Sequence, residues 1–139
     1  HFPGFVAQVV CATDKPFVQS IYEGLVPAYH RGRACLIGDA ATLARPHTGA
    51  GTVKAMSDAF ALSKALVAHP SLESALKAWD EERWAAGNEL VSLGQALGEA
   101  LVNRVPDWRT MNSETMEKWY AAVIAGKSWY QIDEIQKQR

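Results

Sequence analysis

The sequence predicts an α/β fold in which short strands come first and helices follow. Two observations support this order. Before Ala50 the apolar stretches are short and broken by Pro and Gly, whereas after it the apolar residues recur at helical spacing. In addition, residues 34–37 form a continuous apolar run, which is typical of a strand covered on both faces. Such a strand needs neighbours that this chain does not supply, so we expect a fragment of a larger sheet.

Three segments are predicted as strands. Residues 5–11 are apolar and β-branched, and residues 17–22 alternate between two faces. The turn at residues 14–16 can join these two segments as an antiparallel pair. The third segment is the apolar run at residues 34–37, which we expect to be a central strand.

Three segments are predicted as helices. Residues 54–68 are apolar around most of the circumference, so we expect a buried helix that ends at His69-Pro70. Ser71 can cap a second helix, in which apolar residues keep a helical period over residues 72–101. A third helix follows a cap at Ser113. The second helix contains three glycines that predict a kink, a loop or a close helix contact, namely Gly87, Gly94 and Gly98.

The composition argues against several classes of function. The chain has 139 residues, a net charge of −1 and 48% hydrophobic residues, which is ordinary for one globular domain. It has no apolar run long enough for a membrane span and no Lys/Arg block, so we expect neither membrane nor nucleic-acid binding. Two cysteines cannot form a disulfide framework and favour a reducing, cytoplasmic location. No residues have metal-ligand spacing or a nucleophile motif, so we predict no metal site and assign no catalytic residue.

Residues 33–51 carry the most informative pattern. The apolar run is followed by Gly-Asp-Ala at residues 38–40, then by a loop that contains Pro46. Gly-Ala-Gly at residues 49–51 then opens the first predicted helix. Ligands of open α/β sheets bind outside the carboxyl ends of strands, which is where this loop would lie.

The residue types in this loop suit a ligand with hydroxyl groups and negative charge. Gly38 would let a ligand approach the backbone, and Asp39 can accept hydrogen bonds from a sugar-like hydroxyl. Gly49 and Gly51 remove side chains from a helix N-terminus, where backbone N–H groups and the helix dipole favour an anion. A plain strand–turn–helix connection, with Asp39 as a surface residue, is equally compatible with the spacing.

The pattern resembles the second flavin-binding motif of the class A flavoprotein monooxygenases, the para-hydroxybenzoate hydroxylase family. In that motif a strand is followed by Gly-Asp-Ala-Ala, a Pro, and Gly-x-Gly at a helix start. The resemblance covers residues 16–66 and is closest to the dihydroxypyridine hydroxylase branch. The matching residues are 16–21, Gly32-Arg33, 38–41, Arg45-Pro46-His47, 49–51, Lys54-Ala55 and Asp58-Ala59. It implies a Rossmann-like FAD-binding monooxygenase fold.

The resemblance implies a role for each residue of the motif. Asp39 would bind the ribityl chain of FAD, and Pro46 would lie along the isoalloxazine ring. The backbone amides of Thr52 and Val53 would face the N1–C2=O edge, where a helix N-terminus stabilises the negative charge of reduced flavin. The cofactor-binding residues implied in this way are Gly38, Asp39, Ala40, Pro46, Gly49, Ala50, Gly51, Thr52 and Val53.

The resemblance also implies a reaction, the hydroxylation of a small aromatic or N-heteroaromatic substrate with FAD, NAD(P)H and O₂. Arg45 and His47 flank Pro46 and are candidate substrate or flavin contacts, with a surface loop pair as the alternative. Gln19 is a further candidate for the substrate, although sheet packing explains it better.

Two parts of the family's flavin site are absent from this sequence, the G-x-G-x-x-G fingerprint and the middle motif. We therefore expect the C-terminal part of a monooxygenase, inactive alone. Residues 1–70 would hold the end of the substrate sheet, the second FAD-binding motif and its helix, and residues 71–139 a C-terminal helical region. The expected partner is the missing N-terminal FAD-binding segment, and a homodimer is a second expectation. The alternative function is a truncated, non-catalytic helical interaction module.

Overall fold

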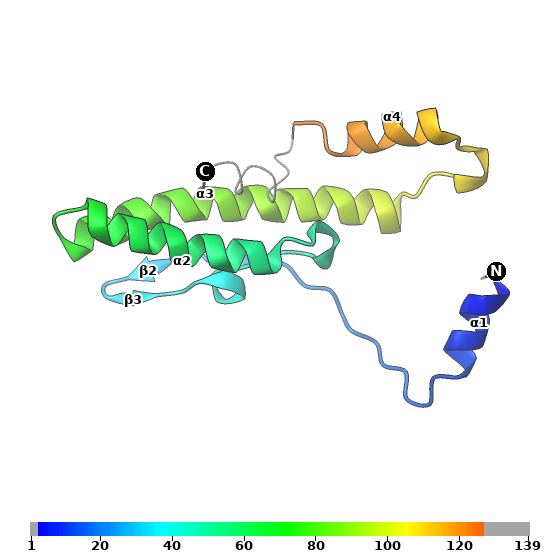
Figure 1. Ribbon diagram of the computed structural model, residues 1–139, viewed down its shortest axis with the longest axis horizontal. Helices are drawn as coiled ribbons and strands as arrows, with labels where there is room; N and C mark the ends of the chain where they lie inside the picture. The colour runs from blue at the N-terminus through cyan, green and yellow to red at the C-terminus, as the bar shows by residue number, and fades with distance from the viewer. Residues whose placement is uncertain (1–2, 127–139) are drawn as a thin grey trace.

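The structure is a computed structural model that describes residues 3–126 (Figure 1). Short strands are followed by long helices, which confirms the predicted α/β class. The helices and strands are α1 (Gly4–Cys11), β1 (Gly24–Leu25), β2 (His30–Arg31), β3 (Ala34–Cys35), β4 (Thr42–Leu43), α2 (Gly51–Ala68), α3 (Leu72–Gly98) and α4 (Ser113–Val123). Single 3-10 turns lie at Gly38–Ala40, Pro46–Thr48 and Trp108–Thr110, and a π-helical turn lies at Glu99–Asn103.

The helices α2 and α3 lie side by side and form the body of the fold (Figure 1). The first of them ends at Ala68 because His69 adopts an extended backbone before Pro70. The side chain of Ser71 accepts a hydrogen bond from the Ser74 N–H, and the two serines form a capping box at the start of α3. The predicted end of one helix and the predicted cap of the next are therefore confirmed.

The largest buried cluster lies where α3 meets the short strands. Tyr29 and Trp79 pack edge to face with their ring centroids 5.8 Å apart, and Ala41 and Leu76 complete the cluster. Burying a large apolar side chain contributes about 1.5–3 kcal/mol, so these contacts fix the strands against α3.

The glycines of α3 are explained by close packing rather than by a loop, because the helix is continuous through all of them. A Cβ at Gly87 would overlap the hydroxyl of Tyr29. A Cβ at Gly94 would lie 3.3 Å from the backbone nitrogen of Arg45, and one at Gly98 would lie 2.7 Å from its Nη1. Small residues on this face let the loop that contains Arg45 approach the helix.

Two of the strand predictions are wrong. Residues 5–11 form most of helix α1, and residues 17–22 have no regular secondary structure, so the expected antiparallel pair does not form. A strand needs a partner for its backbone groups, whereas a helix satisfies them within the segment. No strand of the described chain pairs with either segment. Every residue from 3 to 22 is exposed, and we call this stretch the N-terminal arm.

The third predicted strand is shorter and less covered than expected. It comprises only Ala34–Cys35, which pairs antiparallel with His30–Arg31, and β1 pairs in the same sense with β4. Leu36 and Ile37 are 43% and 44% exposed. The expectation of a central strand covered on both faces is therefore wrong for this chain, because no further strand of the described residues lies beside it.

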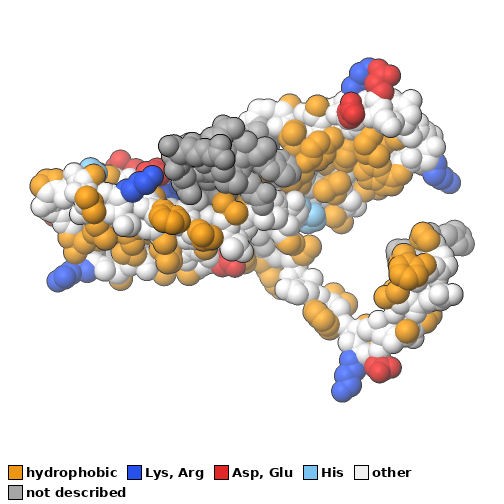
Figure 2. Space-filling model, viewed as in Figure 1, with side chains coloured by type: hydrophobic (Ala, Val, Ile, Leu, Met, Phe, Trp, Pro, Cys, Tyr) orange, Lys and Arg blue, Asp and Glu red, His pale blue; other side chains and the backbone are white. Residues whose placement is uncertain are grey.

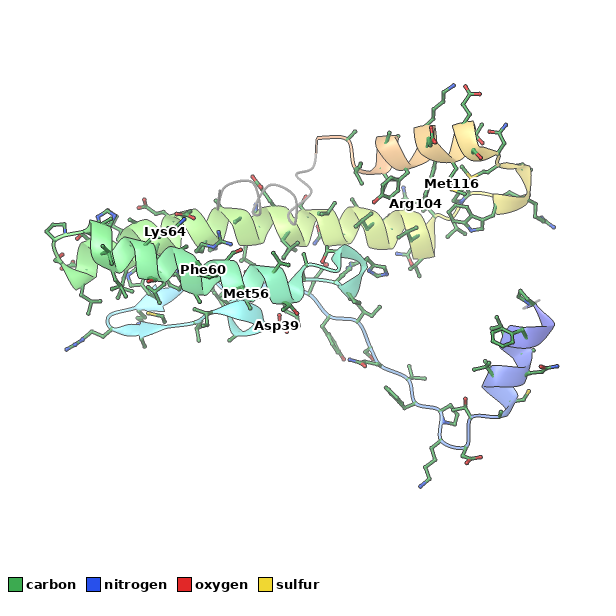
Figure 3. All side chains as sticks on the ribbon, viewed as in Figure 1. Asp39, Met56, Phe60, Lys64, Arg104 and Met116 are labelled. Carbon is green, nitrogen blue, oxygen red and sulfur yellow. The ribbon has the colours of Figure 1, made fainter. Side chains whose placement is uncertain are left out.

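Helix α2 does not bury the face that its apolar residues predicted. Its buried side chains are polar, namely those of Lys54, Ser57 and Asp58. Met56 and Phe60 are more than half exposed. Figure 3 shows these two residues following one another along the helix. The expectation of a helix buried on most sides is wrong, and the charge network described below gives the reason.

The third predicted helix is present and begins one residue earlier than a Ser113 cap would allow. Asn112 is the cap, and its side chain and that of Thr115 form a capping box. Apolar side chains cover much of the visible surface of α4 and of the segment before it (Figure 2). Within residues 3–126, no helix combines the length and the hydropathy that crossing a bilayer requires. The end of the predicted helical region, beyond residue 126, lies outside the described residues.

Candidate flavin site

The turn at residues 38–40 brings Asp39 next to the start of α2 (Figure 3). Gly38 has φ +60°, a left-handed conformation in which a side chain is strained. Asp39 is exposed, and a Cβ added to Gly51 would lie 4.0 Å from its Oδ1. The carboxylate and the first turn of α2 therefore border the same space.

The loop at residues 46–49 leads into this helix start. Pro46–Thr48 form a 3-10 turn, and Gly49 then reverses the chain with φ +62°. Ala50 is the N-cap of α2, and no side chain of the described residues caps it. The N–H groups of the first turn have no acceptor within the helix, and the positive end of the helix dipole lies among them.

A cavity of about 710 Å³ lies between this loop, the helix start and the end of the N-terminal arm. Its size is within the range of small-molecule sites, about 300–1,000 Å³. The residues predicted for binding that line it are Gln19, Asp39, Arg45, Pro46, Gly49, Ala50, Gly51 and Thr52. The structure thus brings together most of the residues that the sequence pattern selected.

Four of the predicted residues do not line the cavity. Gly38 is buried, and a Cβ at that position would lie 3.3 Å from the Cβ of Ala55. Val53 packs against the second buried cluster, whose centre is formed by Ala50 and Leu90. Ala40 is exposed on the turn, and His47 is half-buried with an Nδ1 that has no hydrogen-bond partner among the described residues.

The side chain of Arg45 is already paired. Its Nε donates to Oε2 of Glu23 at 2.7 Å, and Nη2 donates to Oε1 at 3.2 Å. Gln95 of α3 donates to the same carboxylate at 2.9 Å. The hydrogen bonds from Arg45 hold the pKa of Glu23 below its usual value, although partial burial opposes them. Arg45 therefore joins Glu23, the residue that follows the arm, to the loop, and its charge is largely neutralised.

Sequence reasoning missed a buried charge network beneath the turn. Asp58 accepts from the Gly38 N–H at 2.9 Å and from Lys54 Nζ at 2.6 Å, both at Oδ2. Lys54 Nζ also donates to the carbonyl of Gly38 at 2.8 Å. Arg83 of α3 donates from Nε to Oδ1 of Asp58 at 3.0 Å. The three charged side chains are at most 2% exposed.

The network compensates the cost of burying these charges. Burial lowers the pKa of Lys54, and the hydrogen bond to Asp58 opposes that shift. Trp79 donates from Nε1 to the backbone carbonyl of Asp58 at 2.9 Å and anchors this part of α2 to α3. The i,i+4 spacing of Lys54 and Asp58 is a signal that the sequence contains. Arg83, which is buried, offers no comparable signal.

The donors and acceptors at the cavity fit a flavin. Asp39 supplies an exposed carboxylate that can accept hydrogen bonds from the hydroxyls of a ribityl chain. The first turn of α2 supplies backbone donors for the electron-rich edge of a ring. Gly49, Gly51 and Pro46 leave a wall without long side chains, against which a flat ring can lie.

Comparison with known families agrees with this geometry. Residues 20–93, just over half of the chain, match the family described as the FAD binding domain. The chain belongs to this family, and the resemblance drawn from the loop is confirmed. The match reaches residue 93, so it includes most of α3 as well as the motif and α2.

The curated relatives are named as monooxygenases. The chain is 34% identical over 80 residues to 2,6-dihydroxypyridine 3-monooxygenase of Paenarthrobacter nicotinovorans, which is 58% of this chain and 20% of that protein. It is 33% identical over 93 residues to kynurenine 3-monooxygenase of Salinispora arenicola, which is 67% of this chain and 20% of that protein. The chain thus spans about a fifth of the length of the curated relatives it matches.

Solved structures show the same fold. 2,6-Dihydroxypyridine-3-hydroxylase from Arthrobacter nicotinovorans superposes with a TM-score of 0.54 and 29% identity, over 57% of this chain and 20% of that one. A tetracycline destructase superposes with a TM-score of 0.58 over 78% of this chain and 27% of that one. At 18% identity the second likeness concerns the fold alone.

Proposed function

We propose that this chain is the C-terminal portion of a flavoprotein monooxygenase that hydroxylates a small aromatic or N-heteroaromatic substrate with FAD, NAD(P)H and O₂. The observation that carries the proposal is the cavity at which Asp39, the glycine-lined loop and the uncapped start of α2 converge. Membership of the FAD binding domain family and the names of the relatives support the choice of cofactor and reaction.

The bound flavin would supply the activation of O₂. This chain would contribute the side of the binding site that faces the isoalloxazine ring. Asp39 would accept hydrogen bonds from the ribityl hydroxyls. The backbone N–H groups of Thr52 and Val53 would donate to the pyrimidine edge and stabilise negative charge there. His47 lies in the same loop with a buried Nδ1 that has no hydrogen-bond partner among the described residues, and it stays a candidate contact to the substrate or the flavin.

The remaining contacts to FAD would come from an N-terminal FAD-binding segment that is not in this sequence. We expect that segment to pair with the exposed run at residues 34–37, because an unpaired apolar strand edge tends to associate. The isolated chain should then bind FAD only weakly, with a dissociation constant in the high micromolar range, which is roughly −5 to −6 kcal/mol. Titration of FAD into the purified chain, with flavin fluorescence as the readout, measures this constant.

The test of the cofactor assignment is Asp39→Ala in the complete enzyme. Charge-assisted hydrogen bonds of about 1.5–3 kcal/mol would be lost, so FAD affinity should fall about 10- to 100-fold. Asp14→Ala, which removes an exposed carboxylate of the N-terminal arm, is the matched control and should retain full FAD content. Equal flavin content in the two variants after dialysis would contradict the assignment.

A further inference from the structure

The backbone of Gly38 is held from below by two side chains of α2. Its N–H donates to Asp58, and its carbonyl accepts from Lys54. Lys54 and Asp58 also contact each other, so the two side chains and the Gly38 peptide groups form one closed set of hydrogen bonds. The residue that follows Gly38 is Asp39, the carboxylate at the cavity.

We propose that Lys54 and Asp58 are positioning residues of the flavin site, which hold the Gly38 turn so that Asp39 faces the cavity. Arg83 of α3 would hold Asp58 in place, because it donates to the other carboxylate oxygen of that residue. The inference rests on the proposed function, since it takes the ligand of the cavity to be FAD.

The packing of α2 argues that this network serves a position and not only stability. A buried ion pair is on average no more stabilising than well-packed apolar side chains of similar volume. The helix carries such side chains, yet Met56 and Phe60 lie on the surface while Lys54 and Asp58 are buried. Apolar side chains cannot bond to the N–H and carbonyl of a left-handed Gly38, whereas this pair satisfies both.

The charges of the network also act on the position of the Asp39 side chain. The buried groups are two cations, Lys54 and Arg83, and one anion, Asp58. The exposed Glu82 also lies near the network, with its Oε1 3.6 Å from Nη1 of Arg83. The positive charge of Lys54 attracts the carboxylate of Asp39, which raises the energy of moving that carboxylate away from the turn.

A double-mutant cycle in the complete enzyme separates positioning from stability. The variants are Lys54→Met, Asp39→Ala and the double variant, and FAD dissociation constants and thermal unfolding are measured for each. If Lys54 acts through Asp39, Lys54→Met alone should weaken FAD binding about tenfold. In the Asp39→Ala background it should weaken binding less than about threefold further, because the group that it positions is already gone.

The control is Lys64→Met, the same substitution at an exposed position of the same helix, which should leave FAD binding unchanged. Asp58→Asn, which keeps the side-chain shape, supplies a second cycle with Asp39→Ala in case Lys54→Met does not fold. The positioning role would be overturned if the fold-changes in the FAD dissociation constant multiplied in the double variants. It would also be overturned if Lys54→Met and Asp58→Asn alone left FAD binding unchanged. A wild-type enzyme that holds no FAD would instead overturn the proposed function.

Discussion

The N-terminal arm and the pair of helices α2 and α3 differ in which side chains they bury and which they expose. The arm exposes Phe17 and Val18, the latter at 96%, while the helix pair buries Lys54, Asp58 and Arg83 almost completely. Figure 2 shows apolar side chains on the surface of the arm. Burial in this chain follows the partners that are available and not hydrophobicity alone. A charged side chain with a complete set of hydrogen bonds is buried, and an apolar one without neighbours is not.

The largest effect is expected where the buried charges lose their common partner. Asp58→Ala removes the buried carboxylate that Lys54 and Arg83 share, and breaking a buried pair in this way costs about 3–5 kcal/mol. Denaturant unfolding measures the loss. Glu89→Ala removes an exposed carboxylate from α3 and should change stability by less than about 0.5 kcal/mol. A loss of similar size in the two variants would remove the distinction between buried and exposed charge.

A smaller effect is expected where α3 meets the strands. In Gly87→Ala the new methyl group would overlap the hydroxyl of Tyr29. Overpacking costs about 1–3 kcal/mol, and Ala recovers about 1 kcal/mol of helix propensity, so the net loss should be up to about 2 kcal/mol. Gly24→Ala adds a methyl group in open space and serves as the control for thermal unfolding. Equal melting temperatures for the two variants would show that this contact relaxes freely.

A still smaller, pH-dependent effect is expected at Glu23, where the arm meets the helix pair. Its folded-state pKa is lowered by the hydrogen bonds from Arg45, so its stabilising contribution is present above the ordinary value of 4.5 and is lost as pH falls through the folded-state pKa. Glu23→Gln should cost up to about 1 kcal/mol at neutral pH. It should also flatten the fall in melting temperature below pH 4.5. If the melting temperature of the variant falls below pH 4.5 as steeply as that of the wild type, the ion pair between Glu23 and Arg45 does not contribute to acid destabilisation.

The smallest effect is expected in the arm itself. Val18→Asp replaces a fully exposed apolar side chain, and we expect a change within about 0.5 kcal/mol. Leu76→Ala, in the buried cluster, should by contrast cost about 2–5 kcal/mol. Denaturant unfolding of the two variants compares the loss of stability in the arm with the loss in the core. A large loss at Val18 would show that the arm packs against something in solution.

The helices and the loop could be predicted from the sequence because both are local. The helical period and the cap at Ser71 depend on neighbours in the chain. The cap is present, and the α-helix follows the predicted period from Leu72 to Gly98, three residues short of the predicted end at residue 101. The Gly-Asp and Gly-x-Gly motifs are also local, although their spacing alone leaves a plain connection equally possible. The resemblance to the flavin motif selects Asp39 and Gly51, which the structure places around one space.

The strands and the buried network could not be predicted because both depend on distant partners. Residues 5–11 have the composition of a strand, but pairing needs a second segment, and without it the helix is the conformation that satisfies their backbone. Arg83 looks like any charged residue of an exposed helix until Asp58, 25 positions away, is placed beside it. The buried face of α2 was predicted wrongly for the same reason, since contacts with the distant residues Gly38 and Arg83 determine which of its side chains are buried.

The π-helical turn at Glu99–Asn103 changes the phase of the chain as it leaves α3. The Arg104 N–H donates to the Glu99 carbonyl at 2.7 Å, a bond that spans five residues and therefore encloses one residue more than an α-helical turn. In an α-helix one residue corresponds to a rotation of about 100°. The apolar stripe accordingly ends at the buried Leu97, and Leu101, which would continue it, is 39% exposed. Deleting a single residue from this turn would realign the stripe and rotate the chain's exit toward α4 by about a quarter of a revolution.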